Sequence, residues 1–327
     1  ASGESARQDH NLKKLGEKIK LEFHDLFMKY LPRLCNHCLN PACVAACPSG
    51  AIYKRDEDGV VLISQDVCRG WRHCVPACPY KKIYYNWKSN KAEKCVLCYP
   101  RLENGLPTVC TDTCVGRIRY MGVIFYDMDK VEEAAKTESA AHIPASERGI
   151  FLDPRDREVQ KAAREAGISD AWIHAAERSP VDKIIRQWQI ALPLHPEYRT
   201  LPMVWYIPPL SPILKHVEAE VYLPDAADMR IPLEYLAQLF AAGDVAVVKN
   251  TLARLLEMRT VMRSKETKEP VPAELSLHEA EYEAMYRLLA VAKRRDRVVI
   301  PAGLQAETHE RLRELQGSAG YVCPGGC

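Results

Sequence analysis

Cysteine is the residue type in this chain whose number and spacing indicate chemistry. The chain has thirteen cysteines, and eleven of them lie between Cys35 and Cys114. They form three groups: C-x2-C-x4-C-x3-C-P from Cys35, C-x2-W-x2-C-x3-C-P from Cys68, and C-x2-C-x11-C-x3-C from Cys95. Thiolates at such intervals bind soft metal ions and iron–sulfur clusters. The pattern therefore predicts metal chemistry, and it differs from disulfide scaffolds, which are typical of small secreted chains with an even cysteine count.

The first two groups have the spacing of ferredoxin loops that bind two clusters and exchange ligands between them. A loop with cysteines three residues apart can hold three corners of one cubane cluster, and the fourth cysteine begins a helix and reaches the neighbouring cluster. The proline that follows suits the first turn of that helix. This exchange predicts a 4Fe–4S cluster held by Cys35, Cys38, Cys43 and Cys78. The neighbouring cluster is predicted to take Cys47, Cys68 and Cys74.

The second predicted cluster lacks one thiolate, because Trp71 stands where the spacing expects a cysteine. An indole cannot bind iron there, and a cubane without a ligand at one corner tends to lose that iron. We therefore predict a 3Fe–4S cluster, with Trp71 occupying the vacant ligand place. The alternative is that Trp71 is simply a packed aromatic side chain. Both can hold, since a bulky ring would also keep other ligands away from the vacant corner.

The third group does not form a complete ligand set by the same rule. Cys95, Cys98 and Cys110 are predicted to hold a 4Fe–4S cluster whose fourth ligand lies outside this chain. Cys114 is predicted to serve another 4Fe–4S cluster, whose other three ligands also lie outside it. Two alternatives stay open: the four cysteines bind one cluster alone, or an N-terminal motif is missing from the sequence.

Zinc is the competing metal, because C-x2-C pairs are common in structural zinc sites. A zinc site would explain neither C-x4-C-x3-C-P nor the recurring x3-Cys-Pro, so the spacing favours iron–sulfur clusters. His37 lies inside the first group, where cysteines supply every corner, and we expect it to hydrogen-bond or pack. Positive charge near a cluster stabilises its reduced state. Basic residues that crowd the cysteines in the sequence are Arg69, Arg72, Lys81, Lys82, Arg117 and Arg119.

Composition excludes several other classes of protein. Lys plus Arg number 45 and Asp plus Glu 43, for a formal net charge of +2, which is too balanced for a nucleic-acid coat or a polybasic membrane anchor. The sequence has no run of about 18 apolar residues and no apolar signal-peptide core near its start. We therefore expect no nucleic-acid partner and no transmembrane segment in this chain.

The elements that must position the cysteines are short strands and turns. Residues 51–63 and 83–95 are each typical of a β-hairpin, and 119–126 of a closing strand. Cysteine-rich turns flank both hairpins, which suggests an internal repeat. After Asp127 the pattern is mainly that of amphipathic helices. The predicted fold class is α+β: a ferredoxin-like iron–sulfur domain with short β-hairpins, followed by a mostly helical C-terminal extension.

The proline-rich stretch 192–213 is predicted to run extended, because proline stops helices and central strands. It carries large apolar side chains, among them Trp205 and Tyr206, of the types enriched at interface cores. We therefore expect a docking strap that contacts a partner subunit. The alternative is an intramolecular strap laid across the chain's own core.

Three cysteine-bearing segments together resemble the beta subunit of respiratory nitrate reductase: CNHCLNPACVAACPSGAIYKR, CRGWRHCVPACPYKKIYYNWKSNKAEKC and CVGRIRYMGV. So does LPLHPEYRTLPMVWYIPPLSP at 192–212. The nitrite oxidoreductase beta subunit is a near relative with the same pattern. The resemblance covers nearly the whole chain. The Trp within CRGWR and the proline-rich segment are much more specific than a ferredoxin motif alone.

The resemblance implies the electron-transfer subunit of a membrane-associated molybdenum nitrate reductase, with no substrate chemistry on this chain. Electrons would pass from a quinol-oxidising membrane cytochrome b (gamma) subunit to a molybdopterin catalytic (alpha) subunit, in anaerobic nitrate respiration at the cytoplasmic face of the membrane. Family members hold three 4Fe–4S clusters and one 3Fe–4S cluster, and Trp71 would mark the 3Fe–4S site nearest the membrane end. The alternatives are a nitrite oxidoreductase beta subunit, with reversed electron flow, and a zinc-binding interaction module.

The family's first N-terminal cluster motif is absent from this sequence, and the third cysteine group would pair with that motif. We therefore expect an N-terminally incomplete beta subunit. Residues 1–34 are then an N-terminal helix or linker, the remnant of a longer region. Residues 35–128 form the iron–sulfur domain, and 129–327 the helical extension with its strap.

Overall fold

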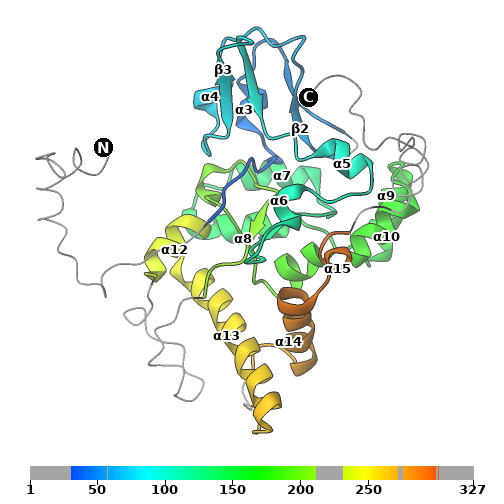
Figure 1. Ribbon diagram of the computed structural model, residues 1–327, viewed down its shortest axis with the longest axis vertical. Coiled ribbons are helices and arrows are strands. Elements are labelled where there is room, and N and C mark those ends of the chain that lie inside the picture. Colours follow the sequence, from blue (N-terminus) through cyan, green and yellow to red (C-terminus); the bar gives the residue numbers. More distant parts are fainter. Residues whose placement is uncertain (1–30, 57, 211–230, 272–274, 300, 302–327) are drawn as a thin grey trace, which may run out of the picture. The chain divides into compact units, whose positions relative to one another are not determined.

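Two β-hairpins carry the cysteine loops. Each is a pair of antiparallel strands, with Ile52 opposite Ile63 in the first and Ile83 opposite Lys94 in the second. The strands are β1 (Ile52–Lys54), β2 (Val61–Ile63), β3 (Ile83–Asn86) and β4 (Lys91–Lys94). In the computed structural model the two hairpins lie side by side (Figure 1). Both hairpins predicted from the sequence are confirmed.

A short helix precedes each hairpin and carries cysteines of the preceding loop. These helices are α3 (Ala42–Ala45) and α4 (Cys74–Ala77), and they contact one another as well as the hairpin that follows each. The order of helix and hairpin therefore occurs twice, as the internal repeat predicted. Between the two units, buried Ile52, Val61 and Ile83 pack with Cys74 and Cys78 in a small apolar core.

One glycine explains how the second cysteine loop fits against the second hairpin. Gly70 has a φ of +70°, and a Cβ atom there would lie 2.3 Å from the backbone oxygen of Asn90. A side chain would therefore be both strained and excluded by the hairpin turn. Gly70 lets the loop that contains Cys68 and Trp71 lie directly on this turn.

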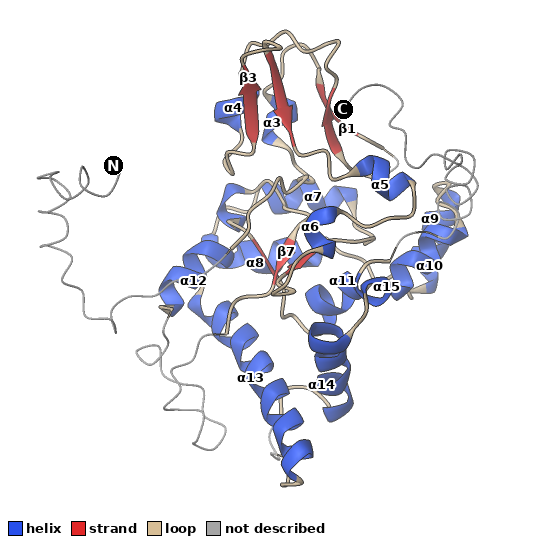
Figure 2. Cartoon of the chain, viewed as in Figure 1, coloured by secondary structure: helices blue, strands red, loops and turns tan. Residues whose placement is uncertain are grey.

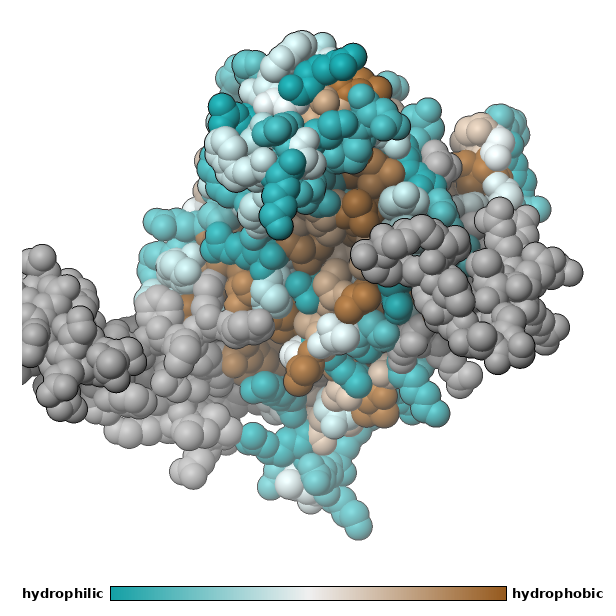
Figure 3. All heavy atoms as spheres, turned by 45° about the horizontal axis from the view of Figure 1, so that its top comes forward, coloured by the Kyte–Doolittle hydropathy of each residue, from teal (hydrophilic) through white to brown (hydrophobic). Residues whose placement is uncertain are grey.

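The structure describes residues 31–56, 58–210, 231–271, 275–299 and 301. Residues 1–30 of the expected N-terminal helix or linker, residues 211–213 of the proline-rich stretch, Cys323 and Cys327 lie outside these ranges. Figure 2 shows that the strands are confined to the two hairpins and one small sheet, with helices making up most of the rest. In Figure 3, hydrophilic residues cover the hairpin end, and apolar residues gather on the face below it. The α+β class and the helical C-terminal part are as predicted.

The helices surround the largest apolar core of the described residues, which includes Ile184, Trp188, Leu255 and Tyr282. Aspartate side chains accept hydrogen bonds from the first N–H groups of three of them, so these helix starts are capped. Before residue 190 the helices are α5 (Tyr99–Glu103), α6 (Val109–Asp112), α7 (Met128–Ala135), η2 (Ala140–His142), α8 (Ile143–Gly149), α9 (Arg157–Glu165), α10 (Asp170–Arg178), α11 (Pro180–Asp182) and the π-helical η3 (Lys183–Gln187). After it come η4 (Pro196–Tyr198), α12 (Leu233–Phe240), α13 (Val245–Thr267), α14 (Glu279–Tyr286), the π-helical η7 (Arg287–Val291) and α15 (Arg294–Arg297).

The closing strand predicted over 119–126 is much shorter than expected. Only β5 (Arg119–Tyr120) forms, and it pairs with β7 (Trp205–Tyr206), which also pairs with β6 (Leu192–Pro193). The ladder stops because the antiparallel register would bring Met203 and Pro202 opposite residues 122 and 123. The N–H of Met203 donates to Asn36 instead, and Pro202 has no N–H.

The described part of the proline-rich stretch belongs to the chain's own core. Trp205 and Tyr206 are 3% and 0% exposed, with the Trp205 ring edge-to-face against Phe151 at 5.4 Å. For these two side chains the structure follows the intramolecular alternative, because aromatic rings buried in their own sheet offer no surface to a partner. Tyr198, at 41% exposed, is the member of the stretch that stays accessible.

Candidate metal centres

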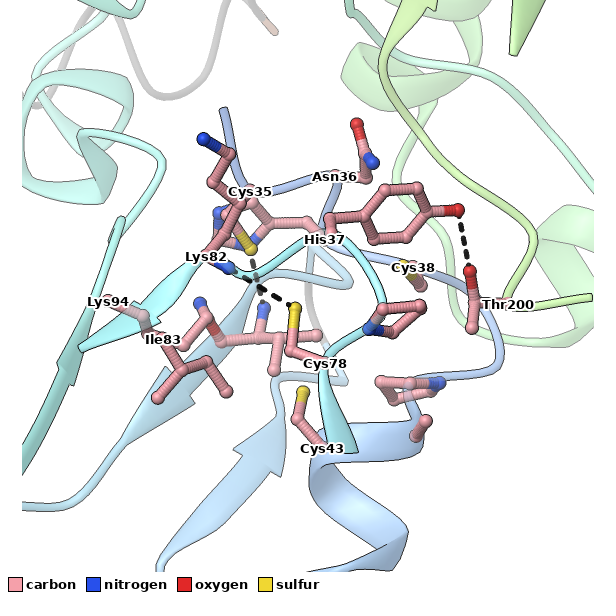
Figure 4. A pocket seen from close by; sticks show the side chains of 15 residues that line it. Cys35, Asn36, His37, Cys38, Cys43, Cys78, Lys82, Ile83, Lys94 and Thr200 are labelled. Atoms are coloured by element: carbon pink, nitrogen blue, oxygen red, sulfur yellow. Dashed lines mark hydrogen bonds between the residues drawn. The ribbon is translucent and has the colours of Figure 1, made fainter. Parts of the chain in front are cut away.

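The first cavity brings together four cysteines from both sequence motifs. Three come from the loop before α3 and from α3 itself, and the fourth follows α4 (Figure 4). The cavity has about 380 Å³ of space between atoms, part of it open to solvent. Its cysteines are Cys35, Cys38, Cys43 and Cys78, the set that the spacing predicted for the first cluster. Four cysteines that line one shared space suit a polynuclear cluster, in which each thiolate binds its own iron.

Burial gives the thiols of this cavity unusual acid–base properties. It raises the pKa of Cys38 to about 12 and that of Cys43 to about 11, and it also raises the pKa of Cys35. Neighbouring cysteines raise these pKa values further, because thiolates repel one another. Since a metal centre binds the thiolate, loading this site releases protons, and the positive charge of iron replaces them.

His37 packs beside the first cavity as a neutral hydrogen-bond acceptor. Its Nδ1 accepts the N–H of Val61 at 3.1 Å, and burial followed by the charge of Lys94 lowers its pKa to about 3. The proton of the neutral ring is therefore on Nε2, which is buried without a partner among the described residues. This bears out the hydrogen-bonding role predicted for His37. It also leaves a donor in the cavity wall, which suits the sulfur atoms of a cluster.

The proline-rich stretch holds the first cysteine loop in place. Backbone hydrogen bonds run from Leu39 N to Leu201 O at 2.8 Å and from Met203 N to Asn36 O at 3.0 Å. Thr200 lines the cavity beside Cys38, and its hydroxyl lies 2.8 Å from the Tyr80 hydroxyl. The stretch therefore acts within the chain, as one wall of the first site.

The second cavity collects the three cysteines predicted for the second cluster. It is similar in size, at about 330 Å³, as expected for the other half of a repeat. Trp71 and its neighbours Arg69 and Arg72 line it with them. Its cysteines are Cys47, Cys68 and Cys74. Trp71 is 57% exposed, so the ring lies at the surface over the cavity and is not a packed core aromatic.

Hydrogen bonds and burial act in opposite directions on the thiols of the second cavity. At Cys47 burial raises the pKa, but hydrogen bonds from Ser49 and from the backbone of residues 49–52 outweigh it and lower the pKa. At Cys74 burial dominates and raises the pKa. The thiols of this second set therefore differ in the direction in which their pKa values shift.

Exposed aromatic and cationic side chains surround the second cavity. The guanidinium of Arg72 lies 5.2 Å from the ring centre of Tyr85 and 5.4 Å from that of Trp87. Trp87 is 72% exposed. Together with Trp71 they form what we name the aromatic rim: Trp71, Arg72, Tyr85 and Trp87. Aromatic side chains and arginine are the types enriched at protein interfaces.

The third cysteine group lies between the second hairpin and β5. Cys95 and Cys98 precede α5, and Cys110 lies in α6. Burial raises the pKa of Cys95, and both Cys35 and Cys110 raise it further, so this thiol lies near the first cavity and near its own group. Cys114 follows α6, where its carbonyl accepts the N–H of Arg117. Apolar side chains flank this group at the surface, with Val115 at 99% exposed.

The basic residues expected near the clusters divide into two kinds. Arg69 and Arg72 line the second cavity, and Lys82 lines the first, where its N–H donates to Cys78 Sγ at 3.4 Å. The other three donate to backbone carbonyls: Lys81 to Pro76, Arg117 to Leu289 and Arg119 to Cys110.

Sequence reasoning missed Lys94, although it directly precedes Cys95. It lines the first cavity, and its Nζ donates to the carbonyl of Cys95 at 2.7 Å and to that of Val61. The sequence signal for Lys94 is its position at the end of the second predicted hairpin, directly before a cysteine motif.

Two observations concern the part of the chain that the structure describes. All eleven of its cysteines are free of disulfide bonds, and it contains no group of three His, Cys, Asp or Glu side chains that could hold a single metal ion. None of its helices combines the length and the apolar composition needed to cross a membrane.

Comparison with known proteins agrees with the geometry. Residues 26–124 match the family described as "4Fe-4S dicluster domain", and residues 210–282 match "Respiratory nitrate reductase beta C-terminal". The match over the cysteine motifs makes iron–sulfur clusters, and not zinc, the cofactor of this fold.

Curated relatives extend the match to almost the whole chain. The nitrate reductase beta chain of Bacillus subtilis is 56% identical over 98% of this chain and 68% of its own length. The respiratory nitrate reductase 1 beta chain of Escherichia coli is 51% identical over 98% of this chain and 64% of its own length. The dimethylsulfide dehydrogenase subunit beta of Rhodovulum sulfidophilum is less similar, at 40% identity over 70% of this chain. This chain spans about two thirds of the length of the nitrate reductase beta chains that it matches, and it belongs to their family.

Proposed function

We propose that this chain relays single electrons within a nitrate reductase, from a quinol-oxidising membrane cytochrome b subunit to a molybdopterin catalytic subunit. The observation that carries the proposal is that two adjacent cavities each collect one complete set of cysteines from two crossed motifs. Iron–sulfur clusters supply one-electron transfer without making or breaking bonds in a substrate. The protein therefore has to hold the clusters, orient them and shield them from water.

The residues proposed for the first cluster hold it on all sides. The thiolates of the first cavity, named above, would bind the four irons of a 4Fe–4S cluster. The Lys82 N–H to Cys78 and the unpartnered Nε2–H of His37 would stabilise negative charge on its sulfur atoms. Thr200 and Tyr80 close the side toward the helical part of the chain.

We propose that the second cavity holds a 3Fe–4S cluster, because it offers three thiolates and an indole. Trp71 would occupy the place of the missing ligand and keep other donors away. A cluster at this position lies close to the surface, beneath the aromatic rim. It is therefore suited to exchange electrons with a partner that docks on that rim.

The partner at the rim would be the membrane cytochrome b subunit, and the molybdopterin subunit would receive electrons on another face. The chain would then be a peripheral protein at the cytoplasmic face of the membrane. The rim supports this assignment through its exposed tryptophans and its arginine, which are suited to a partner at a membrane surface.

For the third group we propose that Cys95, Cys98 and Cys110 hold a further 4Fe–4S cluster, completed by a thiolate from outside residues 1–327, and that Cys114 serves the cluster paired with it. The exposed apolar side chains beside the group, such as Val115, support a covering segment at this place. Adding a peptide with a C-x2-C-x2-C-x3-C motif during anaerobic iron loading should raise the iron bound to the chain, and a peptide with serines should not.

Iron analysis of the anaerobically purified chain tests the proposal directly. The first two sites together should bind roughly seven irons per chain, four and three by their ligand counts. An oxidised sample should show the electron paramagnetic resonance signal of a 3Fe–4S cluster. A sample with zinc and no iron would end the proposal.

A further inference from the structure

Lys94 contacts both the first cavity and the third cysteine group. It is the last residue of β4, and the residue after it is Cys95. Its pairing partner on β3 is Ile83, which also lines the first cavity. The strand therefore delivers an ammonium group into the space between the two groups of cysteines.

The position of the ammonium is fixed by backbone acceptors on two different segments. Nζ donates to the carbonyl oxygen of Cys95 at 2.7 Å, and it also donates to the carbonyl of Val61 on β2. A lysine ammonium has three donors, so one remains. This donor is available to the first cavity, which Lys94 lines together with Cys35.

Lys94 contacts both groups of cysteines. It lines the first cavity together with Cys35 and Cys43, and its Nζ lies 2.7 Å from the carbonyl oxygen of Cys95 in the third group. A charge between them acts on any negative charge that either group carries.

We propose that Lys94 is a positioning residue that places a fixed positive charge between two neighbouring clusters and raises their reduction potentials. One electron added to either cluster adds one negative charge beside the ammonium, and attraction at short range in a partly buried site favours that state. This inference rests on the proposed electron relay. It goes beyond the relay because it names one residue that raises the reduction potentials of two neighbouring clusters.

Redox titration of the full chain, loaded with clusters and purified anaerobically, tests the inference. The readout is the potential of the first-cavity cluster, followed by the paramagnetic signal of its reduced form. In Lys94→Met this potential should shift below that of the wild-type chain. Lys94→Arg keeps the charge and should stay close to the wild-type value.

Two references make the measurement specific. Lys91→Met removes an equal charge from the same strand, where Lys91 likewise donates to a carbonyl, that of Gln65, and lines neither cavity. It should leave the first-cavity potential unchanged. The oxidised signal from the second cavity serves as an internal reference, because Lys94 does not line that cavity.

The possible results separate a failure of this inference from a failure of the proposed relay. A wild-type potential in loaded Lys94→Met overturns the inference, even if that variant is less stable, because a purely structural role changes stability and not potential. Lys94→Gln, which keeps a donor without the charge, covers the case in which the Met variant does not load. If both neutral variants lose iron while Lys94→Arg keeps it, the charge serves assembly and the inference fails. A wild-type chain that binds no iron would instead refute the relay itself.

Discussion

The two cavities are built by the same helix–hairpin unit, yet their surroundings differ. The first is enclosed by residues from distant parts of the chain: Thr200 from the proline-rich stretch, Tyr80 after α4 and buried His37. The second is covered mainly by its own loop, with Trp71 at 57% exposed over it. One repeat has therefore produced an interior site and a surface site. The difference suits a relay, in which one cluster must meet a partner and the next must pass the electron inward.

The largest effect should come from removing the fourth cysteine of one motif or of the other. Cys78 belongs to the second motif in sequence but to the first cavity in space, and Cys47 shows the reverse. Cys78→Ala should therefore abolish the reduced-state signal of the first cluster and spare the 3Fe–4S signal, and Cys47→Ala should do the opposite. Paramagnetic resonance of both oxidised and reduced samples measures the two signals separately. If each variant lost the cluster of its own sequence motif, the crossed assignment would be wrong.

The surface site can be converted into a copy of the interior site by one substitution. Trp71→Cys supplies a thiol at the place of the missing ligand, so the second cavity should bind a 4Fe–4S cluster with a lower potential. The oxidised 3Fe–4S signal should disappear, and iron content should rise by about one per chain. Trp71→Phe is the matched control and should keep the 3Fe–4S signal. An unchanged signal in Trp71→Cys would show that the ring does not stand at the vacant corner.

The proline-rich stretch should matter for the first site and not for the second. Trp205→Ala removes a buried ring from β7, within this stretch, and truncations of this size cost about 3 to 5 kcal/mol of unfolding free energy. Denaturant unfolding should show that loss, with the first-cavity signal weakened more than the second. Trp87→Ala, at an exposed ring of the aromatic rim, should change stability by no more than about 0.5 kcal/mol. Equal loss of both cluster signals in Trp205→Ala would contradict the bracing role.

The sequence predicted which cysteines share a cavity because that grouping follows from spacing within each loop, repeated twice. Their role as cluster ligands stays a prediction. The two hairpins could be predicted equally well, since alternation and turn residues are local signals. What escaped prediction depends on contacts between distant segments. In the sheet that buries Trp205, this residue lies opposite Tyr120 and Pro193, and no local pattern indicates that pairing. The place of Lys94 depends on the carbonyl of Val61, which lies on the other hairpin.

The smallest predicted effect concerns Glu147, a buried carboxyl on the interior side of the first site. It is 3% exposed, neither of its oxygens has a hydrogen-bond partner among the described residues, and it lies near enough to Tyr80 to raise that hydroxyl's pKa. Burial, and then the charge of Glu197, raises the pKa of Glu147 well above its ordinary value of 4.5. The folded chain therefore keeps a proton that the unfolded chain releases above that pH. The stability that this gives is complete below pH 4.5 and is lost as the pH rises toward the folded-state pKa.

Glu147→Gln removes this titration while keeping the shape of the side chain. At neutral pH the variant should be more stable than the wild-type chain by about 1 to 3 kcal/mol, the range for a buried polar group without a partner. The gain should shrink toward zero as the pH falls below 4.5, where the wild-type carboxyl becomes protonated in both states. Denaturant unfolding at a series of pH values measures both. Glu165→Gln, at an exposed position of α9, should give no gain at any of them. A Gln variant that keeps the wild-type pH dependence would show that the pKa of Glu147 is not raised in the folded chain.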